Sequence, residues 1–326
     1  MKRKKDSGTE SGRSSRKSSN NLKLMGRKAS LITRHSSLSL QAPAKINWFL
    51  EVLGKRDDGY HEIQSLLQKI TLYDVLRFTA LDDKVAPGAS QYDNIIIETG
   101  ASIPVQQNLV YKAAVRLKSR YGIEEGAVIH LEKNIPMGAG LGGGSSDAAA
   151  ALQGLNELWS LGLTPEELCD TAEELGSDVP FFLQGPLSYV HGRGEQLIPR
   201  KALGPLDLLL VKPSFDVSTE WVYKNFALLT KKVEKVNNIE HFIRKIERAE
   251  LSGITDDLSN DLESVTVSSF PVIAEIKDML HRQGAVFSLM SGSGSAVFGV
   301  FESRRLAEEA SLIFSDYWTA VVETII

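Results

Sequence analysis

Hydrophobic and polar residues alternate in several short stretches of the chain, which is the pattern of half-buried β-strands. The first stretch, Leu38–Leu53, is interrupted by Pro43 and predicts either two short strands or one strand with a bulge. A strand pair is expected over residues 65–78, and single strands over residues 94–98, 127–131 and 206–211.

In other stretches apolar residues recur at intervals of three and four, and these predict amphipathic helices. One helix is expected over Asn108–Tyr121, with Asn108 as its N-cap and Gly122 just beyond its end. Another begins at Thr164-Pro165, where Thr164 can cap the helix and proline suits its first turn, and it is expected to end at Gly176.

A glycine-rich loop follows the strand expected at residues 127–131 and leads into a helix-forming run, Ala148–Leu152. Its glycines leave the backbone free to adopt positive φ and to approach a ligand closely; they are Gly138, Gly140, Gly142, Gly143 and Gly144. Ser145-Ser146-Asp147 is expected to cap the helix. Backbone N–H groups and the positive end of the helix dipole then converge, which predicts a phosphate site where the serine hydroxyls bind phosphate or approach its magnesium ion.

Three other interpretations of this loop fit less well. A flexible linker would lack the strand before it and the helix after it. Gly138, Gly140 and Gly143 spell the dinucleotide-binding fingerprint, but Lys133–Pro136 separates them from the strand, and the glycines are too many. A Walker loop would close with Lys-Ser or Lys-Thr, which is absent here.

Composition sets the class of protein. The chain has 326 residues, of which 42% are hydrophobic and 24% charged, so it can bury a large core in one or two domains. No stretch approaches eighteen apolar residues, so no membrane-spanning helix is expected. The single cysteine, Cys169, excludes a disulfide framework and a cysteine-rich metal site, and no metal site made of protein ligands is predicted.

The N-terminal residues differ from the rest in composition. The first forty hold eleven Lys or Arg, two acids and many serines, which predicts a disordered extension over residues 1–37. The remainder has 26 basic and 39 acidic residues, a formal charge of −13 that argues against nucleic acid as its main partner. The extension could be a transit peptide to a plastid or could contact nucleic acid. An upstream start codon is the favoured interpretation, with Met25 or a later residue as the functional start and a cytoplasmic location.

Several polar side chains stand out, and each also has an ordinary structural explanation. Lys45 and Asn47 lie two positions apart on an apolar strand, so both side chains are on the same face. They are either functional groups or part of a polar stripe that faces solvent. The turn-rich loop Gly54–Glu62 presents Tyr60 and His61, which can equally be a loop anchor and a surface histidine. Asp178 stands between a helix and an apolar run, where an N-cap or turn role is the simpler explanation.

The glycine loop, Pro136–Ser146, resembles the phosphate loop of the galactokinase, homoserine kinase, mevalonate kinase and phosphomevalonate kinase (GHMP) superfamily. Within that superfamily, Ala42–Leu50 together with Asp58–Glu62 is similar to the opening of the 4-diphosphocytidyl-2-C-methyl-D-erythritol kinase family. The segment around Asp178 and the small-residue turn in Leu289–Phe298 agree in order, so the resemblance covers about residues 40 to 320.

The resemblance implies a fold and a domain organisation. The expected architecture is α/β, or α+β in two parts, with an N-terminal domain like domain 2 of ribosomal protein S5 and a smaller C-terminal α+β domain. The N-terminal ATP-binding domain is expected over residues 38–198 and the C-terminal domain over residues 199–326, with the active site in the cleft between them. The turn in Leu289–Phe298 is expected to close over the phosphate loop.

The resemblance also implies a reaction and the residues that serve it. The family phosphorylates the 2-hydroxyl of 4-diphosphocytidyl-2-C-methyl-D-erythritol with ATP, whose counter-ion is Mg²⁺, in the non-mevalonate route to isoprenoids. Asp178 would be the general base and Lys45 would offset developing charge. The substrate would be held by Asn47, Tyr60, His61, Thr219 and Tyr223. ATP would be bound by Pro136, Met137, Gly138, Ala139, Gly140, Leu141, Gly142, Gly143, Gly144, Ser145 and Ser146.

Two alternatives to this function stay open at the level of sequence. The chain could be another small-molecule kinase of the superfamily, acting on mevalonate, homoserine or a sugar, although the Gly59-Tyr-His61 segment disfavours this. It could also be a non-catalytic nucleotide-binding regulator, against which the presence of both Lys45 and Asp178 argues. A monomer or a homodimer is expected, and Gly192-Arg-Gly-Glu195 is given no chemical role.

Overall fold

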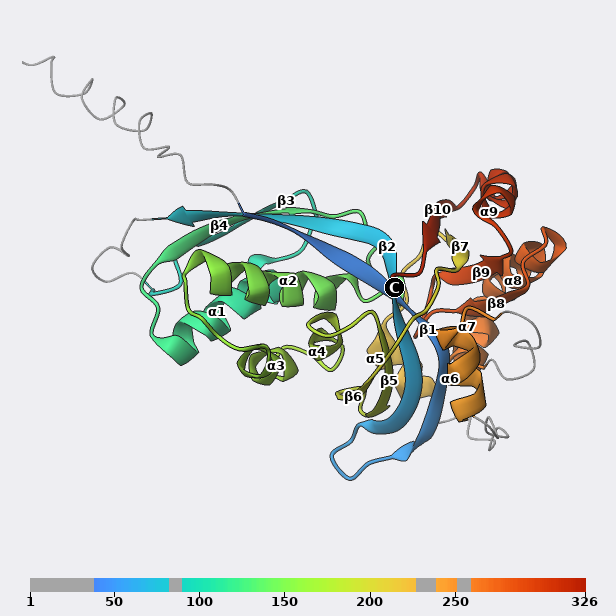
Figure 1. The fold of residues 1–326 in the computed structure, drawn as a ribbon, viewed down its shortest axis with the longest axis horizontal. Helices are drawn as coiled ribbons and strands as arrows, with labels where there is room; N and C mark the ends of the chain where they lie inside the picture. Colours follow the sequence, from blue (N-terminus) through green and yellow to red (C-terminus); the bar gives the residue numbers. More distant parts are fainter. Residues whose placement is uncertain (1–37, 82–89, 227–238, 251–258) are drawn as a thin grey trace, which may run out of the picture. The chain divides into compact units, whose positions relative to one another are not determined.

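The computed structural model describes residues 38–81, 90–226, 239–250 and 259–326. The extension predicted to be disordered, residues 1–37, lies outside them. The first part of the chain forms a six-stranded sheet in which the order is β3-β4-β2-β5-β6 and β1 pairs with β2 (Figure 1). The strands are β1 (Leu38–Lys55), β2 (His61–Leu81), β3 (Ile95–Thr99), β4 (Gly126–Glu132), β5 (Leu187–Gly192) and β6 (Gln196–Arg200).

The two long strands, β1 and β2, test the strands predicted over residues 38–53 and 65–78. β1 is one strand whose pairing with β2 shifts register after Pro43, so the bulged alternative is the one observed. The strand pair expected over residues 65–78 is wrong, because β2 runs without a turn through that stretch. β2 contains no Gly or Pro and pairs in turn with β1, β4 and β5, so its neighbours keep it extended.

Helices α1 (Leu109–Tyr121) and α2 (Gly143–Leu158) pack against this sheet, and α3 (Pro165–Glu173) and α4 (Val179–Phe182) pack against other helices (Figure 1). A short 3₁₀ helix, η1 (Val105–Gln107), precedes α1. The Asn108 side chain accepts from Val110 N and caps α1, and Gly122 ends that helix in the left-handed conformation, as predicted. Thr164 caps α3 through a capping box, also as predicted, but α3 ends at Glu173, before Gly176.

The second part of the chain forms a four-stranded sheet of order β10-β7-β9-β8. Its strands are β7 (Asp207–Lys212), β8 (Phe287–Met290), β9 (Val297–Phe301) and β10 (Trp318–Glu323). Its helices are α5 (Thr219–Phe226), α6 (Ile239–Glu247), α7 (Glu263–Ser269), α8 (Val272–Arg282), α9 (Arg304–Ser311) and η3 (Leu312–Phe314). None of the helices in the described ranges combines the length and the apolar character needed to cross a bilayer.

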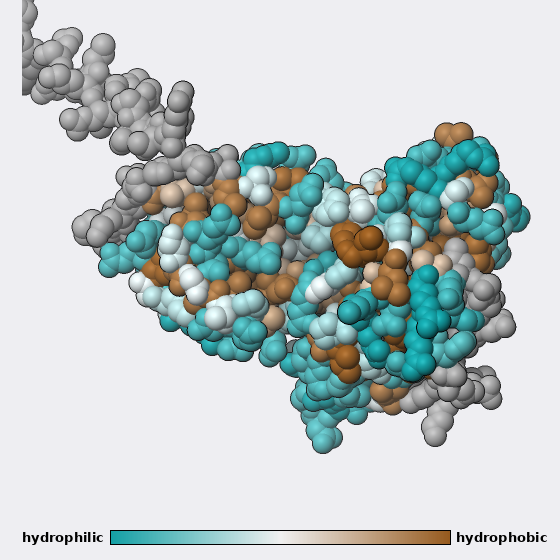
Figure 2. Space-filling model, in the orientation of Figure 1, coloured by the Kyte–Doolittle hydropathy of each residue, from teal (hydrophilic) through white to brown (hydrophobic). Residues whose placement is uncertain are grey.

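The centre of β1 belongs to the cores of both sheets. Trp48 packs against Phe287 and Phe298 of the second sheet, with ring centroids 5.8 and 5.7 Å apart, and Phe49 packs against Phe242 of α6. These contacts join the described residues in one compact unit, so the domain division predicted at residues 198 and 199 stays a prediction. On the face seen in Figure 2, hydrophobic residues lie in small groups among hydrophilic ones, not as one continuous apolar surface.

Candidate active site

A cavity of about 970 Å³ collects nearly all the side chains that the sequence singled out. Its lining includes Lys45, Asn47, Tyr60, His61, the loop residues 136–145, Asp178, Thr219 and Tyr223. Ser146 is the exception among the predicted residues. It is buried below the loop, and its hydroxyl finds no hydrogen-bond partner among the residues that the structure describes.

The glycine loop ends in the helix start that its sequence predicts, but one detail differs. Helix α2 begins at Gly143 with Gly142 as its N-cap, so the prediction that Ser145-Ser146-Asp147 caps the helix is wrong. Gly142 adopts φ 71°, and a Cβ there would lie 2.9 Å from Lys45 Cγ, so the turn needs a residue without a side chain. The three residues of that segment fall inside the helix, where Ser146 N already donates to Gly142 O at 2.9 Å, so the N–H groups that the helix leaves unpaired end at Ser145.

A second small-residue turn, residues 291–296 between β8 and β9, packs directly on the glycine loop, as predicted. Ser291 Oγ donates to Gly140 O at 3.0 Å, and Ala296 N donates to Ala139 O at 3.1 Å. The approach is so close that a Cβ on Gly140 would lie 1.9 Å from Ser291 O. The buried Asn260 side chain holds the same turn by donating to Met290 O and Gly292 O at 2.8 and 2.7 Å.

Lys45 and Asn47 share one face of β1, and that face is buried. Lys45 Nζ donates to Asn47 Oδ1 at 2.5 Å, and Asn47 Nδ2 donates to Ser65 Oγ at 2.8 Å. Each of the two side chains is 4% exposed, so the solvent-facing alternative is wrong. Burial lowers the pKa of Lys45, and the negative charge of Asp178 acts in the opposite direction.

Asp178 occupies the N-cap position of α4, but its side chain makes no capping hydrogen bond. The carboxylate lines the cavity instead, near enough to Lys45 and Tyr223 to influence the pKa of both groups. Burial, and secondarily this carboxylate, raises the pKa of the Tyr223 hydroxyl. The local helix-capping explanation of Asp178 therefore finds no support in its contacts.

Aromatic side chains also line the cavity, and one of them, Tyr223, lies near Asp178. The rings of His61 and Tyr223 stack with centroids 5.2 Å apart and planes 25° apart. Tyr60 is 56% exposed, and the Arg193 guanidinium lies over its ring at 4.9 Å from the centroid. Burial and the charge of Lys55 lower the pKa of His61, which keeps its imidazole neutral at neutral pH.

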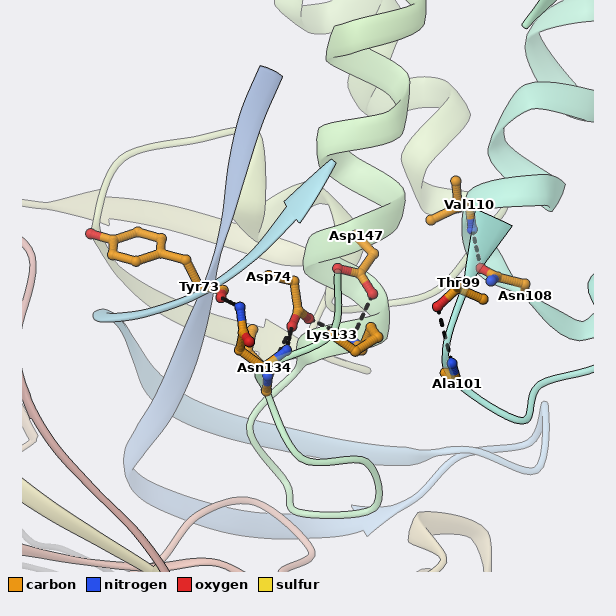
Figure 3. Close-up of polar contacts among 10 residues, drawn as sticks. Tyr73, Asp74, Thr99, Ala101, Asn108, Val110, Lys133, Asn134 and Asp147 are labelled. Carbon is orange, nitrogen blue, oxygen red and sulfur yellow. Dashed lines mark hydrogen bonds and ion pairs between the residues drawn. The ribbon is translucent and has the colours of Figure 1, made fainter. Parts of the chain in front are cut away.

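The sequence did not predict a role for one residue at the cavity, Arg193, or for one cluster of charged residues. Arg193 was given no role, although an arginine between two glycines is presented by a tight turn; both Gly192 and Gly194 have positive φ. The ionic cluster of Asp74, Lys133 and Asp147 behind the glycine loop was missed altogether (Figure 3). No short-range pattern links Asp74 to Lys133, because 59 positions separate them.

Thr219 lies beside the second small-residue turn, where its Oγ1 is 2.8 Å from Ser293 Oγ. The part of the chain that the structure describes contains no group of three or more His, Cys, Asp or Glu side chains arranged to hold a metal ion. The cavity does contain the Asp178 carboxylate and the exposed part of the first turn of α2, with Ser145.

Comparison with known proteins agrees with this geometry. Family models described as GHMP kinases N terminal domain and GHMP kinases C terminal match residues 108–186 and 235–320. The 4-diphosphocytidyl-2-C-methyl-D-erythritol kinase of Thermodesulfovibrio yellowstonii is 45% identical over 291 residues, which are 89% of this chain and 98% of that protein. The enzyme of the same name from Enterococcus faecalis is 42% identical, over 82% of this chain and 91% of that protein.

Solved structures give the same result. A crystal structure of 4-(cytidine 5'-diphospho)-2C-methyl-D-erythritol kinase superposes with a TM-score of 0.72 at 33% identity, covering 88% of this chain and 99% of that one. Homoserine kinase from Cytophaga hutchinsonii has a TM-score of 0.69 at 18% identity, covering 90% of this chain and 96% of that one, and shares the fold. The chain therefore belongs to the 4-diphosphocytidyl-2-C-methyl-D-erythritol kinase family of GHMP kinases, and it is a phosphotransferase.

Proposed function

We propose that this kinase transfers the γ-phosphate of ATP to the 2-hydroxyl of 4-diphosphocytidyl-2-C-methyl-D-erythritol in the non-mevalonate route to isoprenoid precursors. The observation that carries the proposal is that one cavity is lined by the glycine loop, by both Lys45 and Asp178, and by a group of aromatic rings. The loop suits the phosphates of a nucleotide donor, and Lys45 and Asp178 suit the transfer step with its proton acceptor. The aromatic rings suit a substrate that carries a pyrimidine. The relatives are named after the acceptor substrate, and the presence of these features in one cavity supports its assignment to this chain.

The donor phosphates are assigned to the glycine loop. The unpaired N–H groups at the start of α2 and the positive end of its dipole favour an anion there. Gly142 and Gly143 let this turn pack closely on Lys45 and Ile135. The Ser145 hydroxyl lines the same part of the cavity and is placed to bind a phosphate oxygen or Mg²⁺. Mg²⁺ bound to the phosphates would neutralise charge that develops during transfer.

The transfer step is assigned to Lys45 and Asp178. A bond forms between the substrate 2-oxygen and the γ-phosphorus while the bond from that phosphorus to the β,γ-bridging oxygen breaks, and the hydroxyl proton passes to the Asp178 carboxylate. Lys45, held by Asn47 in a buried position, offsets the negative charge on the transferred group. Positioning and electrostatics supply the rate, since no residue becomes covalently modified.

The cytidine end of the acceptor is assigned to Tyr60, His61 and Tyr223. A pyrimidine is flat and stacks on aromatic rings, and the exposed ring of Tyr60 offers such a surface. The neutral imidazole of His61 has one donor and one acceptor nitrogen, which can read the hydrogen-bonding edge of cytosine. Asn47 and Thr219 would hold the remainder of the substrate between this end and Lys45.

We also infer a cytoplasmic enzyme that is a monomer or a homodimer, whose partner is the small-molecule substrate and not nucleic acid. The formal charge of −13 on the residues after the first forty supports the last inference, since nucleic-acid binding favours a basic surface.

The test of the proposed function is ADP formation by the purified protein, followed in a coupled assay with ATP and Mg²⁺. Four acceptors are compared: 4-diphosphocytidyl-2-C-methyl-D-erythritol, mevalonate, homoserine and galactose. Turnover is expected with the first alone. Turnover with another acceptor would refute the assignment of the aromatic pocket but keep the phosphate loop, and turnover with none would favour the non-catalytic alternative.

A further inference from the structure

The ionic cluster behind the glycine loop joins three separate elements (Figure 3). Asp74 lies on β2 and is fully buried, Lys133 directly follows β4, and Asp147 is the fifth residue of α2. Lys133 Nζ lies 2.5 Å from Asp74 Oδ2 and 2.7 Å from Asp147 Oδ2. One ammonium group, whose side chain is 13% exposed and lines the cavity, therefore bridges two buried carboxylates.

The cluster also holds the start of the glycine loop. Asp74 Oδ1 accepts hydrogen bonds from Asn134 N at 2.6 Å and from Ile135 N at 2.8 Å. The Asn134 side chain adds a third bond by donating to Tyr73 O at 3.0 Å. The two residues before Pro136 are thus fixed to β2 by bonds that a shift of the loop would break.

The end of the loop is attached through Asp147. Its Oδ1 atom is buried and has no hydrogen-bond partner among the described residues, so the attachment of this carboxylate runs through Oδ2 and Lys133. The first turn of α2 also packs against the start of the loop, since a Cβ on Gly143 would lie 2.9 Å from Ile135 Cγ2 and 3.3 Å from Lys133 Nζ. Both ends of the loop therefore meet at Lys133.

Stability alone is a poor explanation for this arrangement. Burying three ionisable groups costs several kcal/mol for each before their mutual attraction is counted, and apolar residues of similar volume often replace such clusters without loss. What apolar side chains cannot supply is an acceptor for the Asn134 and Ile135 amides, or a directional link to α2. The free-energy cost of burying these groups is therefore explained by the need to position the loop and α2, not by a gain in stability.

We propose that Asp74, Lys133 and Asp147 are positioning residues that clamp the two ends of the glycine loop, so that its N–H groups are preorganised for the ATP phosphates. The proposal rests on the proposed function, because that assigns the ATP phosphates to this loop. None of the three is assigned contact with the reacting atoms. Burial raises the pKa of Asp147 to about 7, Asp74 acts in the same direction, and Lys133 opposes both, so Lys133 is what favours the ionised form.

The test compares Lys133→Met with the control Lys118→Met. Lys118 is a second buried lysine, 2% exposed, whose ammonium group donates to Asn94 Oδ1, Glu124 O and Glu125 O, none of which belongs to the loop. Binding of a non-hydrolysable ATP analogue with Mg²⁺ is measured by calorimetry, beside the KM of the acceptor. Lys133→Met is expected to weaken analogue binding about tenfold or more and to leave the acceptor KM within about twofold. The size of the effect follows from the precision that such sites need, since a group misplaced by about 1 Å can cost 10²-fold in rate.

A local measurement separates positioning from general destabilisation. Hydrogen exchange of the Asn134 and Ile135 amides is expected to rise in Lys133→Met relative to the amides of α1, and to stay unchanged in Lys118→Met. If Lys133→Met does not fold, Asp147→Asn serves instead, because its amide oxygen still accepts from Lys133 but carries no charge. Asp147→Asn is expected to weaken analogue binding by a smaller factor than Lys133→Met.

The result that would overturn the clamp is analogue binding in the variants within twofold of the wild type, or exchange that rises equally in Lys118→Met. Failure of the proposed function gives a different result. In that case the wild-type protein binds the analogue but does not turn over the cytidine substrate, and the binding and exchange measurements still test the clamp.

Discussion

Replacement of Gly140 by alanine tests whether the contact between the two glycine turns holds the site together. Gly140 adopts φ 74°, and a non-glycine residue in the left-handed region costs about 1–2 kcal/mol. Its Cβ would lie 1.9 Å from Ser291 O, so the turn must move by more than 1 Å. That movement would break the bonds that Ser291 Oγ, Ser295 N and Ala296 N donate to the glycine loop.

Each lost hydrogen bond is worth about 1 kcal/mol, so Gly140→Ala is expected to lower the free energy of unfolding by about 4 kcal/mol in total. The displaced loop is expected to lower kcat/KM for ATP by about 10²-fold. Urea denaturation and steady-state kinetics measure the two effects. Gly122→Ala is the control for backbone strain, because Gly122 has φ 66° and a Cβ there would have no atom within 4 Å.

The control variant is expected to lose only the conformational term, about 1 kcal/mol, with unchanged kinetics. A second control, Gly144→Ala, adds a methyl group to the first turn of α2, where the nearest atom would be Leu109 Cδ1 at 3.7 Å, and is expected to keep its stability. Equal stability losses in Gly140→Ala and Gly122→Ala, with full kcat/KM for ATP in both, would refute the reasoning.

Three other side chains, Asp178, Arg193 and Lys69, each give a further prediction. Asp178→Asn is expected to lower kcat by about 10²–10⁴ with little change in the KM for ATP, the usual worth of a general base, and unchanged turnover would remove that role. Arg193→Gln removes the cation over Tyr60, a contact worth about 0.5–1 kcal/mol, and should raise the KM for the cytidine substrate about two- to fivefold; a change in the ATP KM instead would contradict this. Burial lowers the pKa of Lys69 from 10.5 to about 8, so between these pH values the unfolded chain holds a proton that the folded chain has lost, and the Lys69 term stabilises the fold as pH rises. Over that window the free energy of unfolding of the wild type should gain up to about 3 kcal/mol relative to Lys69→Met, and parallel profiles would disprove it.

The features that the sequence predicted correctly are those that neighbouring residues determine. Asn108 and Thr164 each cap a helix through an amide two or three positions away, so the sequence shows both partners at once. The glycine loop is also a local feature, because the φ values it needs are available to glycine whatever surrounds it. The family resemblance then predicted which side chains act beside the loop, and the structure brings Lys45 and Asp178 to the same cavity.

The features that the sequence did not predict depend on residues far apart in the chain. β2 is one long strand because three other strands pair with it, and its own residues do not show this. The start of α2 was misplaced because Ser145-Ser146-Asp147 is a good capping sequence, whereas the turn at Gly142 depends on Lys45 and Phe182, which leave no room there for a side chain. The bond between Lys133 and Asp74 is likewise visible only after folding.

The most direct test of the central claim is where the phosphate is transferred. After incubation of the protein with ATP, Mg²⁺ and 4-diphosphocytidyl-2-C-methyl-D-erythritol, the product is purified and examined by ³¹P NMR. The proposed function predicts an intact diphosphate and one new phosphomonoester, on the 2-oxygen of the methylerythritol. A phosphate on any other oxygen, a cleaved diphosphate, or release of free phosphate without a new ester would contradict it.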